Sequence, residues 1–295
     1  MNIFIKYPIP AIFFLALLFL SGCRKEIDFR LFYEGDQLVI NAMLTSNEPF
    51  FVELSHTISP SESIAADLLV ANATVNLYQG DSLLFLLEEQ AKGQYRAPMN
   101  WRPVPGESYK IEAIAAGYTT ASTQPVMMPT PPDIQISSFQ DSAYKPMDTG
   151  SSGGRVELTI NDPASENDFY LIRAFADWDS IIVRISNILA DPVLSGNSIC
   201  SYNNSYLSDH CFVESPFKVI YLLSIPSNFD RSIRPSRILL QVSKISESYY
   251  RYYQYQIQPE DFELAFTDPA PTYTNVEQGY GFLGAQNIKM LEIPL

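Results

Sequence analysis

The sequence predicts a mainly β protein, with an N-terminal immunoglobulin-like or transthyretin-like β-sandwich followed by a second β-rich domain with one short helix. Short runs of alternating apolar and polar residues recur at intervals of roughly 8–15 residues, separated by turn-forming Gly, Pro and Asn. The chain contains 18 Tyr, 18 Phe and 21 Pro, which is typical of β-rich proteins with many turns. A chain of 295 residues is long enough for two such domains.

The first predicted domain covers residues 37–128. Its clearest strand signal lies at 72–78, where Val75 and Leu77 would face a core and their neighbours would face solvent. Pairs such as Gly80-Asp81 and Pro105-Gly106 predict turns between runs. Further strands are expected at 38–43, 51–54, 83–87, 94–96, 109–114 and 119–128. About seven strands at this spacing, without a long amphipathic helix, indicate a sandwich.

The Pro-rich segment 129–133 predicts a stiff linker between the domains. The second domain is expected to cover residues 134–295, with a Ser/Gly-rich loop at 149–154. Its strands are expected at 134–139, 155–160, 169–175, 217–223, 237–242 and 288–293.

One segment of the second domain has helical periodicity. Ser246 can cap the N-terminus of this helix, and Pro259 would end it. The residues expected on one face are Tyr249, Tyr252, Tyr253 and Ile257. This tyrosine-rich run could stack on sugars or peptides, but burial of one stripe in the core is favoured.

The charge balance excludes some classes of partner. The formal net charge is −14, from 33 acidic and 19 basic residues. This argues against electrostatic capture of nucleic acid or of anionic lipid headgroups. Two His and three Cys leave little material for metal or nucleophile chemistry. We therefore expect no cofactor and no resident metal, and the ligand is not identified by the sequence.

The first 22 residues have the pattern of an export signal. Lys6 precedes an apolar stretch from Ile9 to Leu20, which is too short to span a bilayer of about 30 Å as a helix. The stretch ends in Leu20-Ser21-Gly22-Cys23, which resembles the lipobox recognised by bacterial lipoprotein signal peptidase. The resemblance implies cleavage before Cys23 and lipidation of its thiol and amine, for example with palmitate. Two or three acyl chains anchor a protein stably, at about 0.8 kcal/mol per buried CH₂.

Residues 23–36 would then form a tether. The segment Arg24-Lys25-Glu26-Ile27-Asp28 resembles the charged export tags of some Bacteroidota surface lipoproteins, although an ordinary solvated tether explains it equally well. The expected location is the outer membrane, with the protein lipid-anchored on either the periplasmic face or the cell surface.

Cys200 and Cys211 remain after lipidation of Cys23. In an oxidising compartment we expect them to form a disulfide that closes a short loop, worth roughly 3 kcal/mol in the chain-entropy model. A metal site formed by Cys200, His210 and Cys211 is the disfavoured alternative, because adjacent side chains are poorly placed around one tetrahedral ion.

Three motifs formally match functional signatures. The glycines of Gly279–Gly284 match G-x-G-x-x-G, but too few residues follow for a dinucleotide-binding fold, and tight turns explain them better. Residues 150–154 match G-x-S-x-G around Ser152, with His210 as the only downstream histidine, yet no strand–turn–helix context surrounds them. The acidic residues near Asp261 lack an EF-hand pattern. We therefore expect no catalytic residues and a protein that is not an enzyme.

Several segments together resemble a family of Bacteroidota outer-membrane lipoproteins, domain of unknown function 4249. The matching segments are residues 23–28, 38–42, 72–78, 93–95, 105–109, 161–163, 168–170, 246–253 and 273–285. The resemblance implies an accessory lipoprotein of an uptake system that partners a TonB-dependent outer-membrane receptor, and it supplies no catalytic residues. The competing interpretation is a structural or adhesive surface lipoprotein without a small-molecule ligand.

Overall fold

A computed structural model describes residues 33, 35–59, 67–146, 151–162, 167–179, 181–190, 200–202, 205–212, 215–226, 234–256 and 273–295. The chain divides into residues 1–34 and one compact unit, Gly35–Leu295. The predicted signal peptide and Cys23 lie outside the described residues, as does most of the 23–36 tether. No helix in the described ranges is both long and apolar enough to cross a membrane.

Strands dominate the described residues, and α3 (Glu247–Gln256) is the α-helix among them, which confirms the predicted fold class. Nine strands lie between residues 38 and 127: β1 (Leu38–Thr45), β2 (Phe51–His56), β3 (Thr74–Gln79), β4 (Ser82–Leu86), β5 (Glu88–Ala91), β6 (Gln94–Arg96), β7 (Ser108–Ile114), β8 (Ala121–Thr123) and β9 (Val126–Met127). They include every strand expected in this region. The strand that the sequence pattern missed is β5, whose four side chains are all exposed and give no alternation.

The remaining elements follow residue 133. They are β10 (Ile134–Tyr144), β11 (Ser151–Ile160), β12 (Phe169–Asp177), β13 (Ile182–Ile185), β14 (Asn187–Leu189), β15 (Ser201–Tyr202), β16 (Tyr206–Ser208), the 3₁₀ helix η1 (Asp209–Cys211), β17 (Phe217–Pro226), β18 (Arg237–Ile245), α3, β19 (Val276–Glu277) and β20 (Tyr280–Pro294). The expected loop at 149–154 is wrong for Ser151–Gly154, which belong to β11. Gly154 faces the side chains of Phe139 and Ile225, so its lack of a side chain is what the packing requires.

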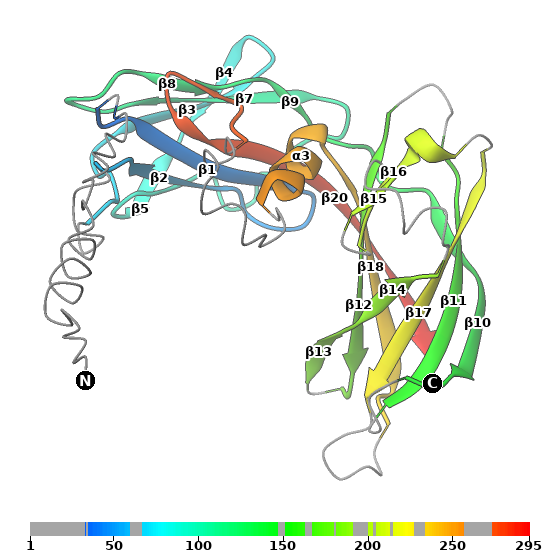
Figure 1. Ribbon diagram of the computed structural model, residues 1–295. Coiled ribbons are helices and arrows are strands. Elements are labelled where there is room, and N and C mark those ends of the chain that lie inside the picture. The colour runs from blue at the N-terminus through cyan, green and yellow to red at the C-terminus, as the bar shows by residue number, and fades with distance from the viewer. Residues whose placement is uncertain are drawn as a thin grey trace, which may run out of the picture. The chain divides into compact units, whose positions relative to one another are not determined.

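The strands form three sheets (Figure 1). A ten-stranded sheet has the order β15-β16-β12-β18-β20-β1-β2-β6-β5, with β13 paired to β12. A six-stranded sheet contains β19-β8-β7-β3-β4, with β9 paired to β7, and a four-stranded sheet has the order β10-β11-β17-β14. One hydrophobic core draws its residues from β1, β2, β6 and the six-stranded sheet, and a second from β12, β18 and the four-stranded sheet. We call these the N-terminal and C-terminal sandwiches.

Strand β20 takes part in both sandwiches (Figure 1). Its first half pairs in parallel with β1, from Val39↔Tyr280 to Thr45↔Gln286. Its second half pairs antiparallel with β18, ending at Ile245↔Gln286. The first core accordingly contains Leu283 and Ala285, and the second contains Ile293. The predicted closing strand at 288–293 is therefore only the second half of an element that begins at Tyr280.

Helix α3 begins where β18 ends and lies beside the first half of β20. Ser246 is its N-cap, as expected, because its Oγ accepts a hydrogen bond from the backbone N–H of Tyr249 at 3.3 Å. Tyr249 and Tyr250 are buried in an aromatic cluster with Phe282 and Tyr206. Of the predicted stripe, Tyr249 is buried and Tyr252 and Tyr253 are half-buried, whereas the buried Tyr250 was not expected on that face. Ile257 and Pro259 lie outside the described residues.

The side chains of Asn275 and Ser246 make hydrogen bonds to backbone groups of β20, as a neighbouring strand would. The Asn275 side chain accepts from the Leu283 N–H and donates to the Leu283 carbonyl, both at 2.9 Å. The Ser246 hydroxyl accepts from the Ala285 N–H at 3.0 Å. These contacts satisfy buried backbone groups that would otherwise lack partners. Within the segment 273–285, Asn275 therefore stabilises the start of β20, which is a structural role.

We expect Asn275→Ala to lower the free energy of unfolding by about 2–3 kcal/mol, because the substitution leaves the buried Leu283 N–H without a partner. Denaturant unfolding followed by circular dichroism measures this loss. Asn76→Ala is the control, since that half-buried amide donates to the Glu112 side chain rather than to a buried backbone group, and its loss should cost less than about 1 kcal/mol. Equal costs for the two variants would contradict the role assigned to Asn275.

Candidate functional site

Three aspartates meet at one end of the C-terminal sandwich. Asp162 follows the last residues of β11, Asp168 directly precedes β12, and Asp209 opens η1 after β16. Strands β12 and β16 pair through Phe169↔Ser208, so the residues next to this pair are also neighbours. The Asp209 N–H donates to the Asp168 carbonyl at 3.0 Å.

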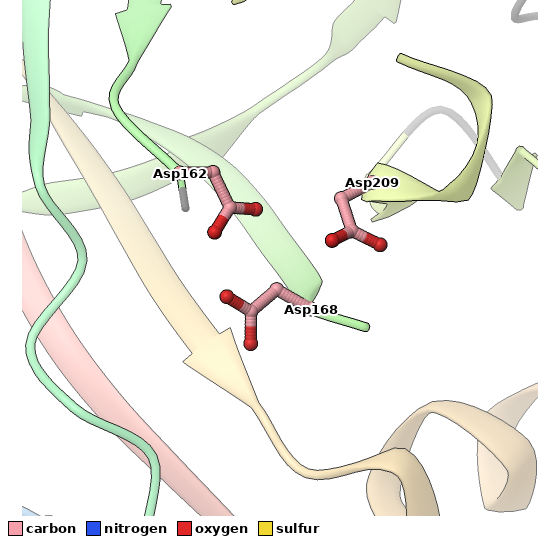
Figure 2. Close-up of side chains that lie close together, drawn as sticks. All are labelled: Asp162, Asp168 and Asp209. Atoms are coloured by element: carbon pink, nitrogen blue, oxygen red, sulfur yellow. The ribbon is translucent and has the colours of Figure 1, made fainter. Parts of the chain in front are cut away.

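The carboxylates of Asp162, Asp168 and Asp209 face one another (Figure 2). One oxygen from each lies within 4.8 Å of the others. Asp162 is 4% exposed and Asp168 is 7% exposed, while Asp209 is half-buried. We call this group the aspartate cluster.

One cation in the described part of the chain contacts the cluster directly. Lys244 of β18 forms an ion pair with Asp168, and both side chains are nearly buried. The β12–β18 ladder places this lysine, because Tyr170 pairs with Lys244. The Lys244 ammonium also donates to the Thr130 hydroxyl at 3.4 Å. With all three carboxylates ionised, the cluster and Lys244 together carry two negative charges.

Asp162 forms no such ion pair among the described residues. Neither of its carboxylate oxygens has a hydrogen-bond partner of normal geometry among the described residues, and the same holds for Asp209 Oδ1. The hydroxyl of Ser215 accepts from the Asp162 backbone N–H at 3.2 Å and does not reach the carboxylate. A buried carboxylate in this condition is costly to keep ionised.

The electrostatics of the cluster follow from this burial. Burial, followed by the hydrogen bond and the negative charge of Asp168, raises the pKa of Asp162 to about 7. Burial also raises the pKa of Asp209 above its ordinary value. Burial and then the charge of Asp162 raise the pKa of the Tyr170 hydroxyl well above its usual range, so this hydroxyl stays protonated beside the cluster.

Two cavities flank the Asp168–Lys244 pair. The first has a volume of about 450 Å³ and is lined by Asp162, Tyr170, Ser215, Lys244 and linker residues 130–133. The second has a volume of about 560 Å³ and is lined by Asp168, Lys244, Arg251, Tyr273 and residues 124–130, among others. The 129–133 linker is held at this place by the Asn287 side chain, which donates to the Pro129 carbonyl at 2.9 Å. Asp162 thus lines the first cavity and Asp168 the second.

Ser152 and His210, which the sequence motif suggested as a nucleophile and its base, are not part of the aspartate cluster. Ser152 lies in β11, ten residues before Asp162, which is about 33 Å of extended chain. Its hydroxyl accepts from Arg234 at 3.4 Å. His210 follows Asp209 in η1, is exposed, and lines neither cavity. The described residues thus do not bring Ser152 and His210 together.

The predicted cysteine pairing falls partly outside the described residues. Cys200 is 2% exposed within the second core. The Cys211 side chain is among those not described, so the Cys200–Cys211 disulfide stays a prediction.

Sequence reasoning missed the aspartate cluster as a site. The three residues span 48 positions (209 − 162 = 47 intervals) and match no ligand-spacing motif. Asp162 and Asp168 do fall in segments quoted for the family resemblance, 161–163 and 168–170, where each sits at the end of a strongly apolar strand. A carboxylate at a strand end is ordinarily solvated, so this signal alone does not predict a cluster.

Comparison with known proteins gives a family and a distant structural likeness. The model of a family described as "Domain of unknown function (DUF4249)" matches residues 24–292. No curated protein has a significant match to the sequence. Among solved structures, the crystal structure of the FN1–FN3 domains of chicken CNTN1 is 11% identical, with a TM-score of 0.29, over 86% of this chain and 65% of that one. The chain thus spans less than two thirds of that structure's length, and the architecture rests on the strand pairing above.

Proposed function

This chain belongs to the DUF4249 family of domains of unknown function, and from this membership we propose that it is a lipid-anchored accessory lipoprotein of the outer membrane. In this proposal the protein is not an enzyme and partners a TonB-dependent receptor in an uptake system. The observation that carries the anchoring is the lipobox-like Leu20-Ser21-Gly22-Cys23 at the end of a short apolar stretch. The first strand begins only 15 residues after Cys23 (38 − 23 = 15), which fits a folded body on a short tether.

The receptor partnership is supported by the resemblance of segments throughout the chain to lipoproteins found beside such receptors. The β architecture and the acidic net charge of −14 are compatible with a binding module. The cavities beside Lys244 offer a place for a ligand whose identity the proposal leaves open.

The anchor is tested by Cys23→Ser. We expect this variant to leave the membrane fraction for the soluble fraction, because it lacks the thiol that receives the lipid. Fractionation and immunodetection measure the distribution. Cys211→Ser is the control, since it removes a cysteine outside the lipobox and should leave the protein in the membrane. Continued membrane association of Cys23→Ser would contradict the lipoprotein proposal.

The partnership is tested by purifying the lipidated protein from native outer membrane in mild detergent and identifying the bound proteins. A stoichiometric TonB-dependent receptor is the expected result. Recovery of the protein without any partner would contradict the uptake role and support the structural or adhesive alternative.

A further inference from the structure

We propose that Asp162, Asp168 and Asp209 form a calcium-binding site, a role that is independent of the lipid anchor and of any receptor. The three carboxylates come from three separate segments and converge on one point (Figure 2). With all three ionised, as they would be around a bound ion, the charge left after pairing of Asp168 with Lys244 is minus two, which matches a divalent cation.

The state of Asp162 is the observation that points to a ligand. Asp162 is only 4% exposed and its carboxylate faces the other two, yet neither oxygen has a hydrogen-bond partner of normal geometry among the described residues. Native proteins satisfy nearly all buried polar groups, so two orphaned oxygens on one buried carboxylate require an explanation. A cation bound between the carboxylates supplies it, because it compensates charge that the chain itself leaves unpaired.

The donor set selects the class of ion. All donors in the cluster are oxygens, which favours hard cations over zinc or copper. One oxygen from each aspartate lies within 4.8 Å of the others. Oxygens on opposite sides of Ca²⁺ are separated by up to about 5 Å, twice the Ca–O distance, so the three carboxylates are close enough for one ion to contact all of them after small side-chain adjustments. Mg²⁺ is smaller and binds oxygens at about 2.0–2.1 Å in a near-ideal octahedron, so carboxylates this far apart fit it less well than Ca²⁺.

The surroundings provide access and room for further ligands. The cavity of about 450 Å³ opens beside Asp162, so water molecules can enter with the ion and complete its coordination. Lys244 opposes binding, because its ammonium lies against Asp168. The site is therefore expected to be weak, with a Kd of roughly 0.1–1 mM, as in extracellular calcium modules.

The test is thermal unfolding of the purified full-length protein in EDTA and in CaCl₂ at about 10 mM, together with calorimetric titration of CaCl₂. Calcium is expected to raise the Tm of the wild-type protein by about 5 °C. Asp162→Asn, which preserves shape and removes the charge, should lose this shift and weaken calcium binding by at least about 10-fold. Asp133→Asn is the matched control, since Asp133 lines the same cavity but is exposed and outside the cluster. It should respond to calcium like the wild-type protein.

A second variant examines the opposing charge. Lys244→Gln removes the ammonium beside Asp168 and should tighten calcium binding several-fold. Weaker binding by this variant would contradict the placement of the ion in the cluster. An unchanged wild-type Tm on addition of calcium, or an equal shift in Asp162→Asn, would overturn the site. An equal shift with MgCl₂ at the same concentration would contradict the assignment to calcium.

Discussion

Deletion of residues 280–295 is expected to abolish cooperative folding of both sandwiches. The deletion removes the parallel partner of β1 and the antiparallel partner of β18. It also removes Leu283 and Ala285 from the first core and Ile293 from the second. Domains are stable by only about 5–15 kcal/mol, and the loss of a central strand from each sandwich exceeds that margin.

Two tryptophans allow each sandwich to be followed separately. Trp101 packs against the first core and Trp178 against the second, and the chain has no other Trp. Fluorescence of the Trp178→Phe protein therefore reports the N-terminal sandwich, and that of Trp101→Phe the C-terminal sandwich. When residues 280–295 are deleted from each of these two proteins, Trp101 and Trp178 are both expected to show the emission of exposed tryptophan.

The control for this truncation is deletion of Leu295 alone. It removes one terminal hydrogen bond, from the Leu295 N–H to the Ser236 carbonyl, and should leave both emission spectra unchanged. A buried Trp101 spectrum in the chain that lacks β20 would show that the N-terminal sandwich folds without its C-terminal strand.

Gly281→Ala is expected to lower the free energy of unfolding by about 3–5 kcal/mol. Gly281 has a φ of 96°, which L side chains rarely adopt, and a Cβ there would lie 2.2 Å from the Ile40 carbonyl oxygen. Relief requires β20 to move away from β1, but the ladder between them runs through seven residue pairs. Denaturant unfolding of the variant measures the cost.

Gly106→Ala separates the cost of the positive φ from the cost of the steric clash with β1. Gly106 has a similar φ of 84°, but nothing lies within 4 Å of the Cβ position. Its substitution should cost only the backbone contribution, about 1–2 kcal/mol. Equal losses in the two variants would show that the close approach of β1 to β20 adds nothing.

The elements that could be predicted are those with a local signal. The alternation at 72–78 becomes β3, and the helix with its Ser246 cap appears where periodicity and capping place it. Elements without alternation were missed, as with exposed β5 and the glycine-rich start of β11. The pairing of β1 with β20 has no local signature, because the partners Val39 and Tyr280 are 241 residues apart (280 − 39).

The aspartate cluster could not be predicted for the same reason. Asp162, Asp168 and Asp209 each look like solvated residues at the end of a strand. Only the pairing of β12 with β16, and the packing of their sheet over β11, brings the three carboxylates together and buries two of them. The orphaned oxygens of Asp162 are visible only once that burial is known.

The sharing of β20 has a consequence for the order of events during synthesis. Residues 38–45 leave the ribosome long before residues 280–286, with which they must pair. Pairing over such a separation is slow, because the chain between the partners must first be ordered. Neither core can close until residues 280–294 have emerged. The nascent chain therefore stays open until residues 280–294 have been synthesised, and it depends on chaperones until then.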